Sequence, residues 1–325
     1  MCEYSVGIFA RIMSRPAAPA VLLADPPNSP KGRLAFAALI AGGLAIAFSP
    51  IFMRLSEIGP LATAVHRLAL GLPVFWLWLA LEKGPDGKNG GRQRGPQSWR
   101  DAGLLALAGL FFALDLAAWH SSLGYTSVAN ATLLANNAPI FVALGAWLLW
   151  RERPTRGFVI GLALSIVGCA LLSRGGFKPG QSTLLGDGLA LLTGVFYSGY
   201  FLTVKRLRAR FTTAAIMTWS AMVGAALLLP AAWITEGGLA EGALLPASLA
   251  GWLVVLALAL FSHVGGQSLI TYAMAHLPAG FSALTLLIQP VGAAIFAWVL
   301  FAEALGPLQL AGGLVVLAGI WLARR

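Results

Sequence analysis

The amino-acid sequence predicts an all-α polytopic membrane protein with ten transmembrane helices, arranged as two inverted five-helix repeats. Composition gives the first sign, because 58% of the 325 residues are hydrophobic, 10% are charged and the mean hydropathy is +0.80. These values lie far outside the range of soluble globular domains. Apolar runs of membrane-crossing length give the second sign, and a duplicated segment gives the third. No run alternates apolar and polar residues as a barrel strand would.

Ten apolar runs follow one another with short polar interruptions, and each is long enough to cross much of a hydrocarbon core as a helix. The expected helices are 34–54, 61–81, 102–123, 127–150, 157–173, 184–205, 213–234, 249–274, 279–301 and 307–323. Residues 1–33 are rich in Pro and Ala, and we expect a disordered cytoplasmic tail there. The first repeat is then 34–173 and the second is 184–323.

The basic residues indicate which side of the membrane each loop occupies. With the N-terminus inside, 18 Lys and Arg residues fall in cytoplasmic segments and three fall in outer segments. This asymmetry predicts cytoplasmic N- and C-termini in a plasma membrane, the inner membrane of a bacterium. It also accounts for the net charge of +10 without nucleic-acid binding, because the charge is spread over loops on one side.

A segment near the middle of the chain recurs at its end, 151 residues later. Within 139–171 and 290–322, nine of 33 positions are identical. The matches that carry the signal involve scarce residue types: Pro139 with Pro290, Trp147 with Trp298, and Glu152 with Glu303. The matched segments are expected helices four and five of each half, so the repeat unit has five helices. Because five is odd, the second unit must have inverted topology.

The same segments resemble the EamA family of the drug/metabolite transporter superfamily. The stretches are YTSVANATLLANNAPIFVALGAWLLWRERPT at 125–155 and LPAGFSALTLLIQPVGAAIFAWVLFAEAL at 277–305, and the resemblance covers 34–323. It implies a secondary transporter, often an exporter of amino acids, metabolites or drugs, with a central cavity between the repeats. It also implies that the fifth and tenth helices lie at the periphery. It does not specify a substrate.

Polar side chains at membrane depth are costly, so they indicate a cavity or a buried contact. Asp115 lies midway along the third expected helix, and His263 lies at similar depth in the eighth. A contact between these two residues could couple protonation to transport, or each could bond a neighbour and fix packing. His263, Gln267 and Thr271 recur at intervals of four and predict a polar face lining the cavity.

The remaining cavity candidates are amides and aromatic residues. Asn130, Asn136 and Asn137 in the fourth expected helix, and Gln289 before Pro290, offer donors and acceptors to a zwitterionic or polyfunctional solute, or bond between helices. Aromatic rings could stack on a flat solute. These are Trp119, one turn after Asp115, with Tyr197, Tyr200 and Trp219. Seven-residue glycine spacings in the fifth and tenth helices (Gly161 and Gly168, Gly312 and Gly319) predict a close-packed seam.

Gates and hinges are expected at three charged residues and two prolines. Arg67, near the outer end of the second helix, could pair with Glu57 or Glu303 in an outer gate, extend to the headgroups, or receive a carboxylate substrate. Glu152 and Glu303 end the fourth and ninth helices and are interpreted as gate residues; Glu152 could pair with Arg151 or Arg153. Pro139 and Pro290 each remove a backbone donor, which predicts kinks that could serve as hinges.

These features favour a secondary carrier of small organic solutes that exchanges the roles of its two halves. Its expected partners are membrane lipid and a small-molecule substrate, with protons as a candidate coupling ion; no cofactor, metal or nucleic acid is expected, and the oligomeric state stays open. Outward transport follows from the family resemblance, and an uptake permease of the same fold is an alternative. An integral-membrane enzyme or a lipid-handling protein is another alternative. There is no ATP-binding loop, and His66, His120, His263 and His276 lack the spacing of a catalytic or metal cluster.

Overall fold

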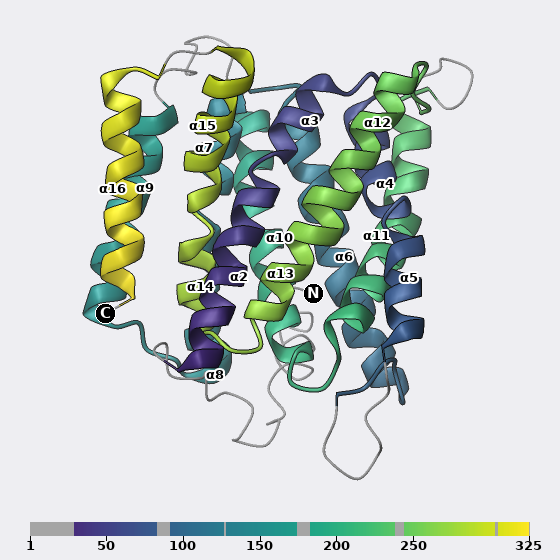
Figure 1. Ribbon diagram of the computed structural model, residues 1–325, viewed down its shortest axis with the longest axis horizontal. Coiled ribbons are helices and arrows are strands. Elements are labelled where there is room, and N and C mark those ends of the chain that lie inside the picture. The colour runs from purple at the N-terminus through teal and green to yellow at the C-terminus, as the bar shows by residue number, and fades with distance from the viewer. Residues whose placement is uncertain are drawn as a thin grey trace.

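The structure is a computed structural model that describes residues 29–82, 92–126, 128–173, 183–237, 244–302 and 305–324. Helices dominate these residues (Figure 1). The first half contains α2 (Pro30–Ile46), α3 (Ser49–Leu55), α4 (Pro60–Ala69), α5 (Leu72–Leu81), α6 (Trp99–Ser122), α7 (Val128–Ala135), α8 (Ala138–Trp150) and α9 (Arg156–Ser173). The second half contains α10 (Leu184–Leu207), α11 (Thr213–Thr235), α12 (Leu249–Ala257), the π-helix η3 (Leu258–Gln267), α13 (Ser268–Ala273), α14 (Ala279–Thr285), α15 (Ile288–Phe301) and α16 (Pro307–Ala323).

The predicted class, an all-α polytopic membrane protein, is confirmed. In the part of the chain that the structure describes, eight helical segments are long and apolar enough to cross a membrane. The apolar helix α16 is shorter, with 17 residues, and α10 has 24 residues but is not one of the eight. The count of ten crossing helices therefore stays a prediction. Glu303, one of the predicted gate residues, falls outside the described residues.

Side-chain caps fix where several helices begin. Ser29 accepts a hydrogen bond from the Gly32 amide at 3.0 Å, and Pro30 occupies the first turn of α2. The first helix therefore begins at Pro30, so that 30–33, which the sequence placed in the tail, are helical. Such a cap satisfies an amide that has no partner within the helix. Equivalent Ser or Thr caps begin α6, α10, α11 and α12.

Four membrane segments are broken in two, and a proline follows each break. Pro50, Pro73, Pro139 and Pro290 lie in the first turns of α3, α5, α8 and α15. Proline has no amide hydrogen to donate and is tolerated at the start of a helix, so each residue pins the break in place. The kinks at Pro139 and Pro290 match the sequence prediction. The breaks before Pro50 and Pro73 and the π-helix η3 were not foreseen.

Contacts between the ends of the helices show that the halves run in opposite directions. At one end of the bundle, Glu57 accepts hydrogen bonds from Ser248, and Glu236 accepts from the amides of Leu61 and Ala62 at 2.7 and 2.9 Å. At the other end, Arg210 forms a 2.7 Å ion pair with Asp101. Accordingly α2 begins at the bottom of Figure 1 and α10 begins at the top. The two repeats are inverted, as an odd number of helices requires.

The contact between Glu57 and Ser248 predicts a pH-dependent stability. Hydrogen bonds from the Ser248 hydroxyl and amide hold the pKa of Glu57 below its ordinary value of 4.5. A lowered pKa stabilises the fold at neutral pH, and this contribution is lost as pH falls through the lowered pKa. We expect Glu57→Gln to lower the melting temperature at pH 7, and the difference from wild type to shrink in acid. A difference that stays constant from pH 7 to pH 3 would contradict this.

The glycines of α9 and α16 form the predicted close-packed seam. A Cβ atom on Gly161 would lie 2.5 Å from the Gly319 carbonyl oxygen, and one on Gly168 would lie 2.6 Å from that of Gly312. Because 161 corresponds to 312 and 168 to 319, the two contacts are exchanged by the symmetry that relates the repeats. The α9–α16 pair lies at one side of the bundle in Figure 1, away from the central helices. This is the peripheral position that the resemblance implied.

Candidate functional site

A cavity of about 970 Å³, counting the space at its mouth, lies between the two halves. Helices from both repeats line it: α2, α3, α4, α6, α7, α8 and α10, with η3, α14 and α15. Most of its wall is apolar, and a few polar groups converge on it, which is typical of a small-molecule site. Those polar residues are Ser49, Arg67, Asp115, Trp119, Thr132, Asn136, Thr193, Tyr197, Gln267 and Gln289.

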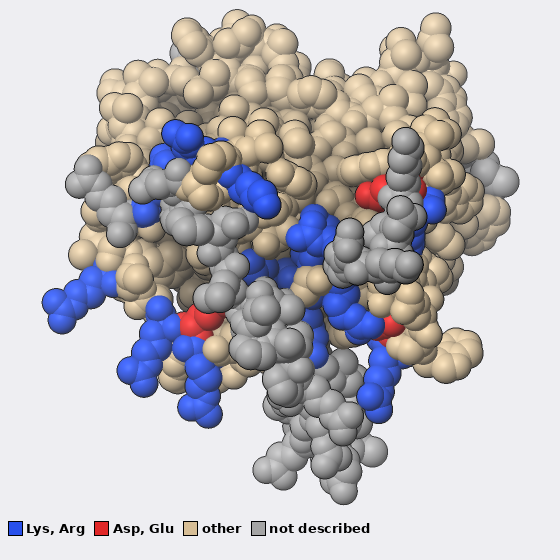
Figure 2. Space-filling model, turned by 60° about the horizontal axis from the view of Figure 1, so that its bottom comes forward, with Lys and Arg blue, Asp and Glu red and all other residues tan. Residues whose placement is uncertain are grey.

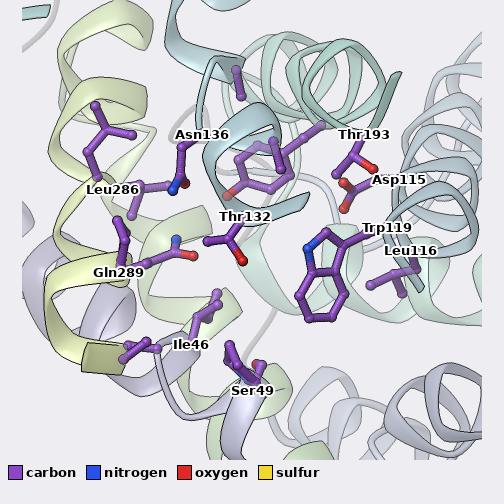
Figure 3. Close-up of a pocket in the computed structure, with 18 of the residues that line it drawn as sticks. Ile46, Ser49, Asp115, Leu116, Trp119, Thr132, Asn136, Thr193, Leu286 and Gln289 are labelled. Carbon is purple, nitrogen blue, oxygen red and sulfur yellow. The ribbon is translucent and has the colours of Figure 1, made fainter. Parts of the chain in front are cut away.

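Two residues of opposite charge line this cavity. Asp115 on α6 and Arg67 on α4 are 8% and 6% exposed, so both charged groups are withdrawn from bulk solvent. They influence each other electrostatically, yet these two side chains form no ion pair within 4 Å. Trp119 lies one turn beyond Asp115 on the same side of the cavity, and Asn136 and Gln289 lie opposite, with Thr132 between them (Figure 3). A solute can therefore meet both charges, an indole ring and two amides.

Several polar atoms in the cavity wall have no hydrogen-bond partner within the protein. They are Ser49 Oγ, Arg67 Nε and Asn136 Nδ2. A buried polar group without a partner costs about 1–3 kcal/mol. Three such atoms around one cavity mark a site where a small movement of the wall would let water or a polar solute satisfy them.

The cavity is built from equivalent positions of the two repeats. Gly194 of α10 packs against the break between α7 and α8, where its Cβ would lie 3.3 Å from the Ala135 carbonyl oxygen. Gly43 is its equivalent 151 residues earlier and packs against the break before α15. A Cβ on Gly43 would lie 2.9 Å from the Ile288 side chain. Equivalent positions nevertheless carry different chemistry, since Ala138 corresponds to Gln289. A symmetric frame thus carries an asymmetric set of polar groups.

Comparison with known proteins agrees with this architecture. The model of the EamA-like transporter family matches the chain twice, over residues 33–174 and 184–325. The chain belongs to the EamA-like transporter family. It is a membrane transporter of small solutes, and the integral-membrane enzyme considered from the sequence is not supported.

Several relatives of this EamA-like transporter are transporters or exporters by name. A probable terminal-alkyne amino-acid exporter of Streptantibioticus cattleyicolor is 30% identical over 285 residues, 86% of this chain and 89% of the relative. A pseudopaline exporter of Pseudomonas aeruginosa is 29% identical over 222 residues, 68% of this chain and 75% of the relative. A solved crystal structure shares the fold with a TM-score of 0.70 at 19% identity, covering 89% of this chain and 96% of the other.

Six of the twelve cavity candidates named from the sequence of this EamA-like transporter lie in the cavity wall. They are Asp115, Trp119, Asn136, Tyr197, Gln267 and Gln289, and Pro139 and Pro290 join them. Sequence reasoning missed the hydroxyls of Ser49, Thr132 and Thr193. Such hydroxyls commonly bond their own helix, as Thr193 does to the Leu189 carbonyl at 3.2 Å. The four-residue spacing of Thr132 and Asn136 was the available signal.

Two of the predicted asparagines lie elsewhere. Asn130 donates to Thr126 Oγ1 at 3.0 Å and to the carboxylate of Asp187, and so joins the ends of two helices. Asn137 donates to the carbonyl oxygens of Leu133 and Leu134 at 3.2 and 3.1 Å. Both amides bond within the protein, and neither lines the cavity.

Tyr200 and His263 are packed beneath the cavity and do not line it. Tyr200 is fully buried, stacks on Phe112 and accepts a hydrogen bond from Gln267 at 3.3 Å. The His263 ring is also fully buried, 5.3 Å from the Phe75 ring and 5.5 Å from the Phe112 ring. Neither ring nitrogen of His263 has a hydrogen-bond partner, so the expected contact with Asp115 is not formed.

The predicted gate residues have three different outcomes. Arg67 faces the cavity, and Glu57 is engaged by Ser248, so neither an Arg67–Glu57 gate nor extension to the headgroups is formed. Glu152 is partly buried at the other end of the bundle, and the charge that acts on it is that of Lys205, not that of Arg151 or Arg153. Burial raises the pKa of Glu152, and Lys205 opposes this. Glu303 lies outside the described residues.

Proposed function

We propose that this transporter exports small zwitterionic organic solutes of the amino-acid type. The observation that supports this most is that Arg67 and Asp115, two buried residues of opposite charge, line the same cavity without forming an ion pair with each other. A guanidinium binds a carboxylate, and a carboxylate binds an ammonium group. Asn136 and Gln289 add neutral donors and acceptors, and Trp119 adds a flat apolar surface. The export direction is suggested by the relatives that are named exporters.

The transport cycle that we propose is rocking of the two inverted repeats around the cavity. Inverted repeats can exchange conformations, which gives two states of similar energy with opposite openings. Pro139 and Pro290 lie where broken helices meet the cavity, so they remain our candidates for hinges. Small angular changes at these breaks would move whole half-helices without breaking further backbone hydrogen bonds.

We further propose that the basic end of the bundle is cytoplasmic, in the inner membrane of a bacterium. Figure 2 shows Lys and Arg side chains gathered on the face at the bottom of Figure 1. That end carries Arg151, Arg153, Arg156, Arg206 and Arg210. Positive charge at cytoplasmic loops is the general rule of membrane topology. Both termini would then be cytoplasmic.

Counterflow in proteoliposomes tests the proposed function. Vesicles preloaded with one unlabelled amino acid from a panel are diluted into trace labelled amino acid, and transient accumulation of label above equilibrium is expected for at least one zwitterionic member. A carboxylate without an amino group and an amine without a carboxylate, both of similar size, serve as controls, since each leaves one of the two buried charges unpaired. Flux without saturation would indicate a channel, and no counterflow for any panel member would contradict the proposal.

Proton coupling is a separate part of the proposal, and Asp115 is its candidate carrier. It is the carboxylate on the cavity wall, and its protonation would change the charge that a solute meets. We expect an inward-directed proton gradient to drive uphill transport by wild type and not by Asp115→Asn. Gradient-driven transport that survives this substitution would exclude Asp115 from coupling.

A further inference from the structure

A second pocket of about 790 Å³, counting its mouth, opens at the basic end of the bundle. It lies where α8 and α16 end and where α9 and α14 begin. Its floor is apolar and its rim carries charges of both signs. The lining residues that matter here are Ala143, Ala146, Glu152, Arg153, Phe281 and Arg324.

This pocket and the central cavity lie along one seam between α8 and α14, which pack against each other. On the α8 side, Ala138 and Pro139 line the cavity, whereas Ala143 and Ala146 line the second pocket. On the α14 side, Ala283 lines the cavity and Phe281 lines the pocket. The two hollows therefore lie along one seam and are separated by the residues between these positions.

The closed part of the seam contains a buried polar group without a partner. Val142 and Ser282 are both fully buried between the two lined stretches, and no group in the protein bonds the Ser282 hydroxyl. Leu202 of α10 packs there as well, against Gly145. An unpartnered hydroxyl in a permanent core would be costly. A seam that opens and admits water during transport would satisfy it.

Lys205, near the end of α10, ties the two sides of this seam together. The residue is 7% exposed, and its ammonium group donates to the carbonyl oxygens of Met274 and Leu277 at 3.0 and 2.7 Å. Leu277 precedes Pro278, which lines the second pocket, and Glu152 of the same pocket attracts the ammonium group. Cations are stabilised by carbonyls at a helix C-terminus. Lys205 thereby joins α10, which packs on α7 and α8, to the turn between α13 and α14.

The equivalent tie in the other repeat differs. The residue 151 positions before Lys205 is Arg54, whose guanidinium lies 4.8 Å from the centre of the Phe301 ring. Arg208, which donates to the carbonyl oxygens of Thr271 and Phe211, corresponds to Glu57, a residue of opposite charge. The two ends of an otherwise symmetric frame are thus held by different chemistry.

We propose that the second pocket is the inner mouth of the solute path and that Lys205 is the latch that separates it from the central cavity. The inference rests on the proposed function. A zwitterionic solute fits the mouth, because Arg153 and Arg324 can receive its carboxylate and Glu152 its ammonium group. When Lys205 releases the two carbonyls, α14 can move from α8 and join the mouth to the cavity.

Cysteine accessibility tests the latch without knowledge of the solute. Cys2→Ser and Cys169→Ser remove both native cysteines, and Thr132→Cys then places a reporter in the cavity wall. Right-side-out and inside-out vesicles are treated with a membrane-impermeant cationic methanethiosulfonate. We expect Lys205→Met to raise the rate at which the cysteine at 132 reacts from the inner face by at least about tenfold, and to lower its rate from the outer face. The reason is that the two charge-assisted hydrogen bonds that favour the state closed on the inner side are lost.

Four controls sharpen this test. Arg206→Met removes a neighbouring charge and should leave both rates unchanged. Lys205→Arg keeps the donors and should keep the inner face closed, and an anionic methanethiosulfonate must give the same changes as the cationic one. Ala146→Cys in the second pocket should react from the inner face even when Lys205 is present. If Lys205→Met does not fold, Lys205→Gln should give a smaller change of the same sign.

The outcomes separate this inference from the proposed function. Unchanged rates for folded Lys205 variants would overturn the latch, even if counterflow is normal. An Ala146→Cys reporter that does not react from the inner face would overturn the mouth. A failed counterflow panel together with the expected accessibility changes would overturn the substrate class and leave the gated path intact.

Discussion

Replacing Asp115 with asparagine or Arg67 with glutamine is expected to lower kcat/KM for solute counterflow by about 100-fold each. A hydrogen bond to a buried charge is worth about 1.5–3 kcal/mol, and each 1.4 kcal/mol is tenfold. Both residues are more than nine-tenths buried on the cavity wall, where water does not screen the charge. Counterflow over a range of solute concentrations measures the expected rise in KM and fall in kcat.

Stability separates recognition of solute from damage to the fold. Each single substitution leaves the other charge buried without its electrostatic partner, so each should lower the melting temperature. The double variant Arg67→Gln/Asp115→Asn removes both charges and should recover much of that stability without recovering transport. Recovery of transport in the double variant would show that the two charges serve packing and not binding.

Replacing Gly312 with alanine is expected to destabilise the protein by about 1–3 kcal/mol, the usual cost of overpacking. Its Cβ would lie 2.7 Å from the Gly168 carbonyl oxygen and 2.8 Å from the Leu172 amide nitrogen, both backbone atoms that cannot turn aside. The adjacent residue provides a matched control. On Gly313 a Cβ would meet the Val291 side chain at 3.6 Å, an ordinary contact.

The same glycine-to-alanine change is therefore expected to have opposite effects on stability at these two neighbouring positions. Gly313→Ala should be neutral or slightly stabilising, because alanine favours helix over glycine by up to about 1 kcal/mol. Thermal unfolding in detergent, followed by tryptophan fluorescence, measures both. Equal effects of the two substitutions would contradict the seam between α9 and α16.

Features that repeat along the chain could be predicted well. The length of the apolar runs predicted membrane-crossing helices, and Pro139 and Pro290 predicted kinks, because both depend on local backbone chemistry. The 151-residue repeat predicted the inversion, because a unit with an odd number of helices must start on the opposite side. The glycine seam followed for the same reason, since small residues at a fixed spacing on one helix face favour close packing.

Features that depend on distant partners could not be predicted. Asn130 bonds Asp187, 57 residues away, and no local pattern shows this pairing. His263 lies within η3, where the widened turn of a π-helix changes which side chains share a face, so its four-residue spacing to Gln267 misled. The position of Arg67 along its expected helix placed it near the outer end, but that position does not show that the side chain faces the cavity.

The most direct test of the central claim is the sidedness of two positions that the repeat makes equivalent. Thr155 directly precedes α9 and Gly306 directly precedes α16, one repeat of 151 residues apart, and a Cβ on Gly306 meets no atom closer than 3.7 Å. In a chain without its native cysteines, Thr155→Cys and Gly306→Cys are treated with an impermeant maleimide in spheroplasts. We predict that Gly306→Cys reacts in intact spheroplasts and that Thr155→Cys reacts only after permeabilisation. Reaction of both positions from the same face would contradict the inverted repeats and the cavity built between them.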